Sequence, residues 1–147
     1  MISQYNGDLL KSGCDMICHQ VNEYGVMGAG IAKQIKDTFQ PLYDGYKSIC
    51  GRTEKDSLYG CVWFYFYGNP QKAVANCFSQ RNGVTNIDDL KKCVKSLHKI
   101  AAARGYKTIG IPYKYGCGIA TGEWEEVEQV FKNEFEHSKI DLQVWRL

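Results

Sequence analysis

The stretch ICHQVNEYGVMGAGIAKQI, residues 17–35, carries the pattern that decides the fold of this chain. It begins as an apolar run that predicts a buried strand, and it ends as a helix with Ile31 and Ile35 on one side. Between them stands GVMGAG, residues 25–30, in which glycine lets the backbone approach a ligand closely. This order predicts an α/β unit that binds a ligand at the carboxyl end of its strand.

The rest of the chain repeats the alternation of strands and helices. Short apolar runs predict strands at residues 2–5, 15–21, 58–67, 73–79, 108–111 and 140–145. Helical periodicity predicts one helix that starts at Gly28 and others at residues 42–49, 86–104 and 122–135. Asn86 and Asp89 are expected to form a polar N-terminal cap. Elements in this order predict a layered α/β domain with a mostly parallel or mixed sheet.

Size, composition and charge favour one globular domain over residues 1–147. The chain has 147 residues, of which 44% are hydrophobic and 23% are charged. The N-terminal segment lacks the features of a signal peptide and no long apolar run occurs, so we expect a cytoplasmic protein without a membrane partner. Seven irregularly spaced cysteines predict reduced thiols. A net charge of +2 with dispersed lysines predicts no specific nucleic-acid footprint.

A second glycine-rich segment, YGCGIATG at residues 115–122, also lies between a predicted strand and a predicted helix. Helix starts offer unpaired N–H groups to anions, so the two segments together predict loops that close over a diphosphate. Common phosphate motifs do not fit, because Lys33 stands where the fingerprint GxGxxG needs its last glycine and no P-loop pattern occurs. The alternative interpretation is that these glycines serve only turn and helix-packing geometry.

Four segments, in order and spacing, make the chain resemble the macrodomain family of ADP-ribose-binding proteins. They are NGDLL at residues 6–10, the stretch 17–35, AVANCFSQ at 73–80 and IGIPYKYGCGIATGEWEEVEQVF at 109–131. The H-x-x-N motif followed by M-G-x-G-I-A most resembles the branch that includes ADP-ribose-1''-phosphate phosphatases and terminal ADP-ribose glycohydrolases. The resemblance implies a three-layer α/β/α fold around a mixed, mostly parallel sheet of about six strands. It implies no cofactor.

The resemblance also implies ligand contacts. Asp8 matches the acidic residue that accepts a hydrogen bond from the adenine amino group, although Asp8 also fits a simple turn residue. Asn22 is expected to contact the distal ribose, the one remote from adenine. The two glycine loops are expected to enclose the diphosphate. The other implied contacts are Leu9, Gly28, Ala29, Gly30, Ile31, Gly116, Cys117, Gly118, Ile119, Ala120 and Thr121. An aromatic wall for adenine is expected, but the sequence does not single out its residue.

His19 and Asn22 are the candidate catalytic residues. In the phosphatase branch H-x-x-N lies beside the distal ribose, which implies that His19 serves as general base or orients a water. The opposite interpretation is that His19 is a hydrogen-bonded structural residue within a strand. The glycohydrolases of the branch use a lysine and an aspartate, where this chain has SQR at residues 79–81 and Ala120. A lysine-adduct mechanism is therefore not expected, since arginine keeps its proton.

A metal site is not expected. Cys14, Cys18 and His19 form C-x-x-x-C-H, but adjacent strand residues face opposite sides and the paired spacings of structural zinc are absent. The chain is expected to bind ADP-ribose or a derivative, either free or attached to an ADP-ribosylated macromolecule. It is further expected to hydrolyse ADP-ribose-1''-phosphate or to remove ADP-ribose from targets. The alternatives are a non-catalytic ADP-ribose reader and an unrelated nucleotide-binding domain.

Overall fold

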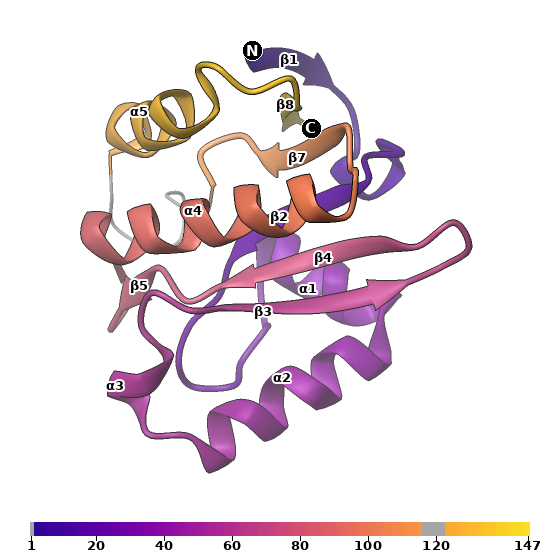
Figure 1. Ribbon diagram of the computed structural model, residues 1–147. Coiled ribbons are helices and arrows are strands. Elements are labelled where there is room, and N and C mark those ends of the chain that lie inside the picture. Colours follow the sequence, from indigo (N-terminus) through magenta and orange to yellow (C-terminus); the bar gives the residue numbers. More distant parts are fainter. Residues whose placement is uncertain (1, 116–122) are drawn as a thin grey trace.

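The computed structural model describes residues 2–115 and 123–147 (Figure 1). Within these residues the centre of the fold is a six-stranded sheet with the strand order β1-β8-β7-β2-β4-β3. Its strands are β1 Ile2–Asn6, β2 Met16–Gln20, β3 Val62–Tyr67, β4 Lys72–Cys77, β7 Thr108–Pro112 and β8 Asp141–Arg146. β3 runs antiparallel to β4, and the other neighbouring pairs are parallel. The prediction of a mixed, mostly parallel sheet is confirmed.

Helices cover both faces of the sheet (Figure 1). α1 Gly30–Thr38 and α2 Gln40–Arg52 pack on one face, whereas α4 Ile87–Ala103 and α5 Trp124–Phe135 pack on the other. β2 is buried along its whole length because it lies between these layers, which explains its nearly continuous apolar sequence. The three-layer α/β/α architecture is confirmed.

α4 agrees closely with its sequence prediction. Its buried side carries the apolar stripe Leu90, Val94, Leu97 and Ala101. At its start the Asn86 side chain accepts a hydrogen bond from the backbone N–H of Asp89 at 2.9 Å. A cap of this kind stabilises a helix by about 1 kcal/mol. The predicted cap is confirmed.

Several element boundaries differ from the sequence predictions. α2 spans Gln40–Arg52 instead of residues 42–49, β4 ends at Cys77 instead of residue 79, and α5 starts at Trp124 instead of residue 122. The starts of β3 and α1 also differ. Leu58 ends a short helix, α3 Lys55–Leu58, so β3 starts later than expected. α1 begins at Gly30 rather than at Gly28, because Ala29 is an extended N-cap residue with φ of −151°. Both errors arise where an apolar or small residue fits either neighbouring element.

Besides α3, three small elements were not predicted. They are the 3-10 helix η1 Leu9–Lys11 and the hairpin strands β5 Gln80–Arg81 and β6 Val84–Thr85. Elements of two or three residues leave no periodicity to recognise in a sequence. η1 follows β1 and the hairpin follows β4, so both lie at the carboxyl end of the sheet.

The apolar surface of the helices that pack on the sheet is buried inside the fold. The apolar sides of α1 and α2 contribute to one core, and those of α4 and α5 contribute to the other. In residues 2–115 and 123–147, no helix combines the length and the apolar character that crossing a bilayer requires.

Candidate functional site

A cleft of about 430 Å³ opens at the carboxyl ends of β1, β7 and β8, next to the start of α1. Its lining residues are Gly7, Asp8, Leu9, Gly30, Ile31, Gln34, Pro112, Tyr113, Lys114, Trp145, Arg146 and Leu147. This end of a parallel sheet is where α/β folds bind ligands. The cleft contains four of the residues that the resemblance to macrodomains implies as ligand contacts: Asp8, Leu9, Gly30 and Ile31.

Asp8 is partly buried in the wall of the cleft. Its Oδ1 accepts a hydrogen bond from the backbone N–H of Leu10 at 3.0 Å and thereby caps η1. Within the described residues, no hydrogen-bond donor contacts its second oxygen, Oδ2. The turn role of Asp8 therefore coexists with an unoccupied acceptor in the cleft. Its contact with adenine stays a prediction.

Trp145 and Tyr113 give the cleft its aromatic surface, which sequence reasoning missed. Trp145 stacks on Tyr5, its register partner on β1, with ring centroids 5.0 Å apart and 12° between the ring planes. Its Nε1 donates to Oε1 of Gln143 at 3.0 Å, which fixes the orientation of the indole. The guanidinium of Arg146 lies 4.4 Å from the centroid of the Tyr113 ring. The sequence feature that could have indicated Trp145 and Tyr113 is their position at the carboxyl ends of predicted strands.

Gly7 provides the space that Trp145 occupies. It has φ of +142°, and a Cβ atom at this position would lie 3.1 Å from Cζ3 of Trp145. A larger residue would therefore be strained and would displace the indole ring.

The start of α1 forms another wall of the cleft. Gly30 has φ of +60°, which glycine adopts without strain, and Ala29 before it makes no side-chain cap. The first N–H groups of α1 therefore lack a side-chain acceptor, and they lie at the positive end of the helix dipole. This arrangement favours an anion. Gly28 and Ala29 are exposed and precede the residues that line the cleft.

The second glycine loop lies outside the described residues. The predictions that rest on it, and that therefore stay predictions, concern Gly116, Cys117, Gly118, Ile119, Ala120 and Thr121. The chain enters this loop through Lys114 and Tyr115, which have φ of +65° and +44°. Tyr115 is fully buried, and its hydroxyl lies 3.2 Å from Oγ of Ser79. The loop therefore starts beside the carboxyl end of β4.

Asn22 organises the loop between β2 and α1. Its Oδ1 accepts hydrogen bonds from the backbone N–H of Tyr24 at 2.9 Å and from the hydroxyl of Tyr46 at 2.8 Å. Its Nδ2 donates to the carbonyl of Val26 at 2.7 Å. The amide thus shapes the loop that leads to the first glycine segment, and its contact with a ribose stays a prediction.

His19 lies inside the sheet with no exposed surface. Its Nε2 is 2.7 Å from Oδ1 of Asn76, the residue opposite it on β4. Asn76 donates its Nδ2 to the carbonyl of Trp63 at 3.0 Å, so its Oδ1 accepts and we infer that Nε2 carries the proton. Burial lowers the pKa of His19, which keeps the ring neutral near pH 7.

These contacts are those of a structural histidine. A general base must reach the proton that it removes, directly or through one water. Nδ1 of His19 is buried and has no hydrogen-bond partner among the described residues. The catalytic interpretation of His19 stays a prediction, and its burial does not favour it.

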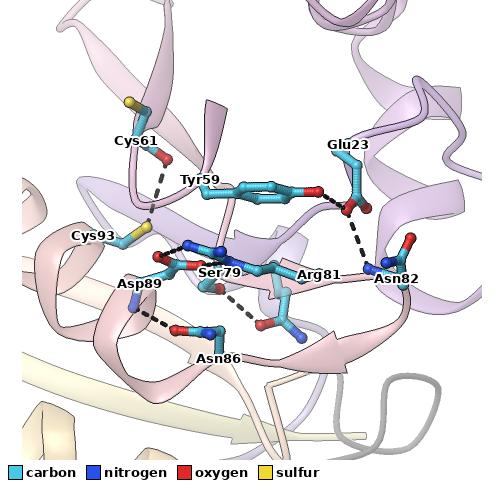
Figure 2. Close-up of polar contacts among 10 residues, drawn as sticks. Glu23, Tyr59, Cys61, Ser79, Arg81, Asn82, Asn86, Asp89 and Cys93 are labelled. Carbon is cyan, nitrogen blue, oxygen red and sulfur yellow. Dashed lines mark hydrogen bonds and ion pairs between the residues drawn. The ribbon is translucent and has the colours of Figure 1, made fainter. Parts of the chain in front are cut away.

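Residues 79–81 stand where the glycohydrolases of this branch carry their lysine, and here Arg81 forms an ion pair with Asp89 (Figure 2). The guanidinium of Arg81 contacts both carboxylate oxygens of Asp89, at 2.7 and 3.0 Å. It also lies 4.4 Å from the ring centroid of Tyr59. Gln80 beside it carries no ionisable group. Residues 79–81 therefore offer no amine for adduct chemistry.

The described residues contain no cluster of three or more histidine, cysteine or acidic side chains that could hold a metal ion. Cys18 lies 3.5 Å from Cys77, measured between their sulfur atoms, in the core beneath α4 and α5. His19 faces the other side of the sheet, where it contacts Asn76. The described cysteines are free thiols, and Cys117 lies outside the described residues.

Comparison with known proteins agrees with this architecture. The sequence matches the Macro domain family over residues 18–131. The chain belongs to the macrodomain family. A DNA ADP-ribosyl glycohydrolase of Mycobacterium bovis (strain BCG / Pasteur 1173P2) is 39% identical to this macrodomain over 54 residues, which are 37% of this chain. The match spans 15% of the length of that relative.

Solved structures of macrodomains share the whole fold. A protein of unknown function from Bacteroides thetaiotaomicron is 26% identical with a TM-score of 0.88, over 100% of this chain and 98% of that chain. Thermosipho africanus DarTG in complex with ADP-ribose is 22% identical with a TM-score of 0.82, over 99% of this chain and 41% of that chain. At 22% identity, the likeness to the Thermosipho africanus protein shows a shared fold alone.

Proposed function

We propose that this macrodomain binds ADP-ribose in the cleft beside α1 and hydrolyses the bond to the group that ADP-ribose carries. That group is either the phosphate of ADP-ribose-1''-phosphate or an ADP-ribosylated macromolecule. One observation supports the binding part: the cleft combines the carboxylate of Asp8, the ring of Trp145 and the uncapped helix start at Gly30. An adenine offers an amino donor and a flat ring, and a diphosphate offers negative charge. Each feature of the cleft complements one of these.

The charges around the cleft suit an anionic ligand. Lys114 and Arg146 line it, and Asp8 is the acidic residue among its lining side chains. Two cations near a small cleft raise the local concentration of a diphosphate. The ADP-ribose complex of the Thermosipho africanus protein, which has the same fold, supports this choice of ligand.

The hydrolytic part of the proposal rests on the relatives. The mycobacterial protein is named a DNA ADP-ribosyl glycohydrolase, although its match covers a limited part of both chains. In the proposed reaction Asn22 contacts the distal ribose, and a water beside it attacks one end of the bond that is hydrolysed, either C1'' of that ribose or the phosphorus of the 1''-phosphate. This bond breaks, the water oxygen stays on the attacked atom, and the proton that the water loses passes to the departing atom. His19 contributes by holding the end of β2, since its ring does not reach the surface.

A non-catalytic reader of ADP-ribosylated partners is the second candidate. The burial of His19 favours it, because the candidate base has no access to a substrate. The ion pair of Arg81 with Asp89 also favours it, because a lysine nucleophile is missing there.

Calorimetry with ADP-ribose tests the binding part. We expect a Kd at roughly micromolar strength, which corresponds to about −8 kcal/mol. Absence of binding at millimolar ADP-ribose would refute the proposed function as a whole.

Turnover separates the enzyme from the reader. The protein is incubated with ADP-ribose-1''-phosphate, with an ADP-ribosylated protein and with ADP-ribosylated DNA, and released ADP-ribose or phosphate is measured. Turnover of one of these substrates supports the hydrolase and names its substrate class. Micromolar binding without turnover of the three establishes the reader. A general base contributes about 10²–10⁴-fold to a rate, so a folded His19→Asn variant that retains turnover excludes His19 as the base.

A further inference from the structure

Glu23 is a buried carboxylate in the loop between β2 and α1, and no role has yet been given to it. It is 1% exposed. Its Oε2 accepts a hydrogen bond from the hydroxyl of Tyr59 at 2.6 Å and another from the backbone N–H of Asn82 at 3.1 Å (Figure 2). One oxygen atom therefore joins three segments that are distant in the sequence: the loop after β2, the turn before β3 and the β5–β6 turn.

The burial of this carboxylate is costly unless hydrogen bonds compensate it. The bond to Glu23 raises the pKa of Tyr59 to about 12, so the hydroxyl stays a donor at neutral pH. The guanidinium of Arg81 lies against the face of the Tyr59 ring, and its ion pair with Asp89 fixes it in this position. Oε1 of Glu23 is buried and has no hydrogen-bond partner among the described residues. Both hydrogen bonds of the carboxylate among the described residues are therefore made by Oε2, one to each of the two turns.

Two of the joined segments follow β2 and β4, and these strands neighbour the strands that form the proposed ADP-ribose cleft in the order of the sheet. The cleft is formed by the ends of β1, β8 and β7, and the order of the sheet places the ends of β2 and β4 immediately beyond β7. A ligand that passes the start of α1 from the Trp145 side therefore reaches the segments that follow β2 and β4. Two exposed side chains meet there, since the hydroxyl of Tyr24 donates to Oδ1 of Asn82.

We infer that Glu23 is a positioning residue: it holds Asn82, and through it Tyr24, as the wall of the site that contacts the sugar beyond the diphosphate. This inference rests on the proposed function. It assigns the preference for ADP-ribose over ADP to the Tyr24–Asn82 wall, because ADP ends before it. Asp8, Trp145 and Gly30 act on the part that both ligands share.

Affinity for ADP-ribose and for ADP, measured by calorimetry on the same variants, tests this assignment. Glu23→Ala removes the shared acceptor, and we expect a roughly tenfold loss of affinity for ADP-ribose. Affinity for ADP should change by less than about twofold, since the contacts proposed for ADP, at Asp8, Trp145 and Gly30, do not involve Glu23 or the Tyr24–Asn82 wall. Glu23→Gln should restore the native preference, because its single carbonyl oxygen can accept both hydrogen bonds. Tyr59→Phe removes one of the two donors and should give an intermediate loss.

Glu54→Ala is the matched control, an exposed glutamate of the neighbouring turn, and it should leave both affinities unchanged. A folded Glu23→Ala variant that keeps the native ratio of the two affinities would overturn the inference, as would an equal loss for both ligands. If Glu23→Ala does not fold, the ratio in Tyr59→Phe decides, and an unchanged ratio there has the same consequence. A native protein that binds neither ligand would instead refute the proposed function.

Discussion

Asp8 has two separable tasks in the structure, and substitutions can remove them independently. Oδ1 caps η1 by accepting the N–H of Leu10 at 3.0 Å, while Oδ2 faces no donor among the described residues. Asp8→Ala removes both acceptors. Asp8→Asn keeps an acceptor for the cap but places an amide donor where an adenine amino group would need an acceptor.

The two tasks predict different magnitudes. Loss of a cap lowers the free energy of unfolding by about 1 kcal/mol, which shifts the melting temperature of a chain of this size by about 3 °C. Loss of a hydrogen bond to a charged acceptor lowers the binding free energy by about 1.5–3 kcal/mol, or roughly 10- to 150-fold in Kd. We expect Asp8→Ala to show both losses and Asp8→Asn to show the binding loss with near-native stability.

Thermal unfolding and calorimetry with ADP-ribose measure the two effects. Asn86→Ala is the matched control, because it removes the cap of α4 outside the cleft and should reduce stability similarly without weakening binding. Native affinity in Asp8→Asn would refute the assignment of Oδ2 to adenine. An affinity loss in Asp8→Ala no larger than that in Asn86→Ala would lead to the same conclusion.

Burial and packing support four further predictions. Trp145→Ala should weaken ADP-ribose binding by about 1–3 kcal/mol in calorimetry if the indole stacks on the base, and unchanged affinity would remove it from the site. The pKa of His19 is lowered in the folded protein, so the unfolded chain binds a proton more readily, and the free energy of unfolding should fall as the pH drops below about 6.5. Chemical denaturation at several pH values measures this fall. In His19→Gln it should be smaller by up to about 1.4 kcal/mol per pH unit. Gly45→Ala should destabilise the fold by about 1–3 kcal/mol, because its Cβ would lie 2.6 Å from the Trp63 ring. Gly51→Ala in the same helix meets no atom within 4 Å and should instead raise the melting temperature.

The sequence predicted much of the architecture because its signals are local. The apolar run before residue 21, the glycine segment after it and the stripe on α4 each specify an element without reference to the rest of the chain. Boundaries failed where the deciding contact is not local, as at Leu58, which packs as the end of α3 rather than in a strand. The β5–β6 hairpin is too short to leave a pattern.

The sequence by itself determined the order of the strands and helices, and it predicted the kind of site and one end of it. The glycine segment before Ile31 predicted a diphosphate site, because the anion preference of a helix start depends on neighbouring residues alone. The resemblance of four sequence segments to macrodomains implied the family and a ligand contact at Asp8. Tertiary structure alone decided which side chains share the cleft. Trp145 lies beside Gly7 because β8 pairs with β1 in one register, and no local pattern records that pairing. The same holds for His19, which is buried because β2 has a neighbouring strand on each side and a layer of helices on each face of the sheet.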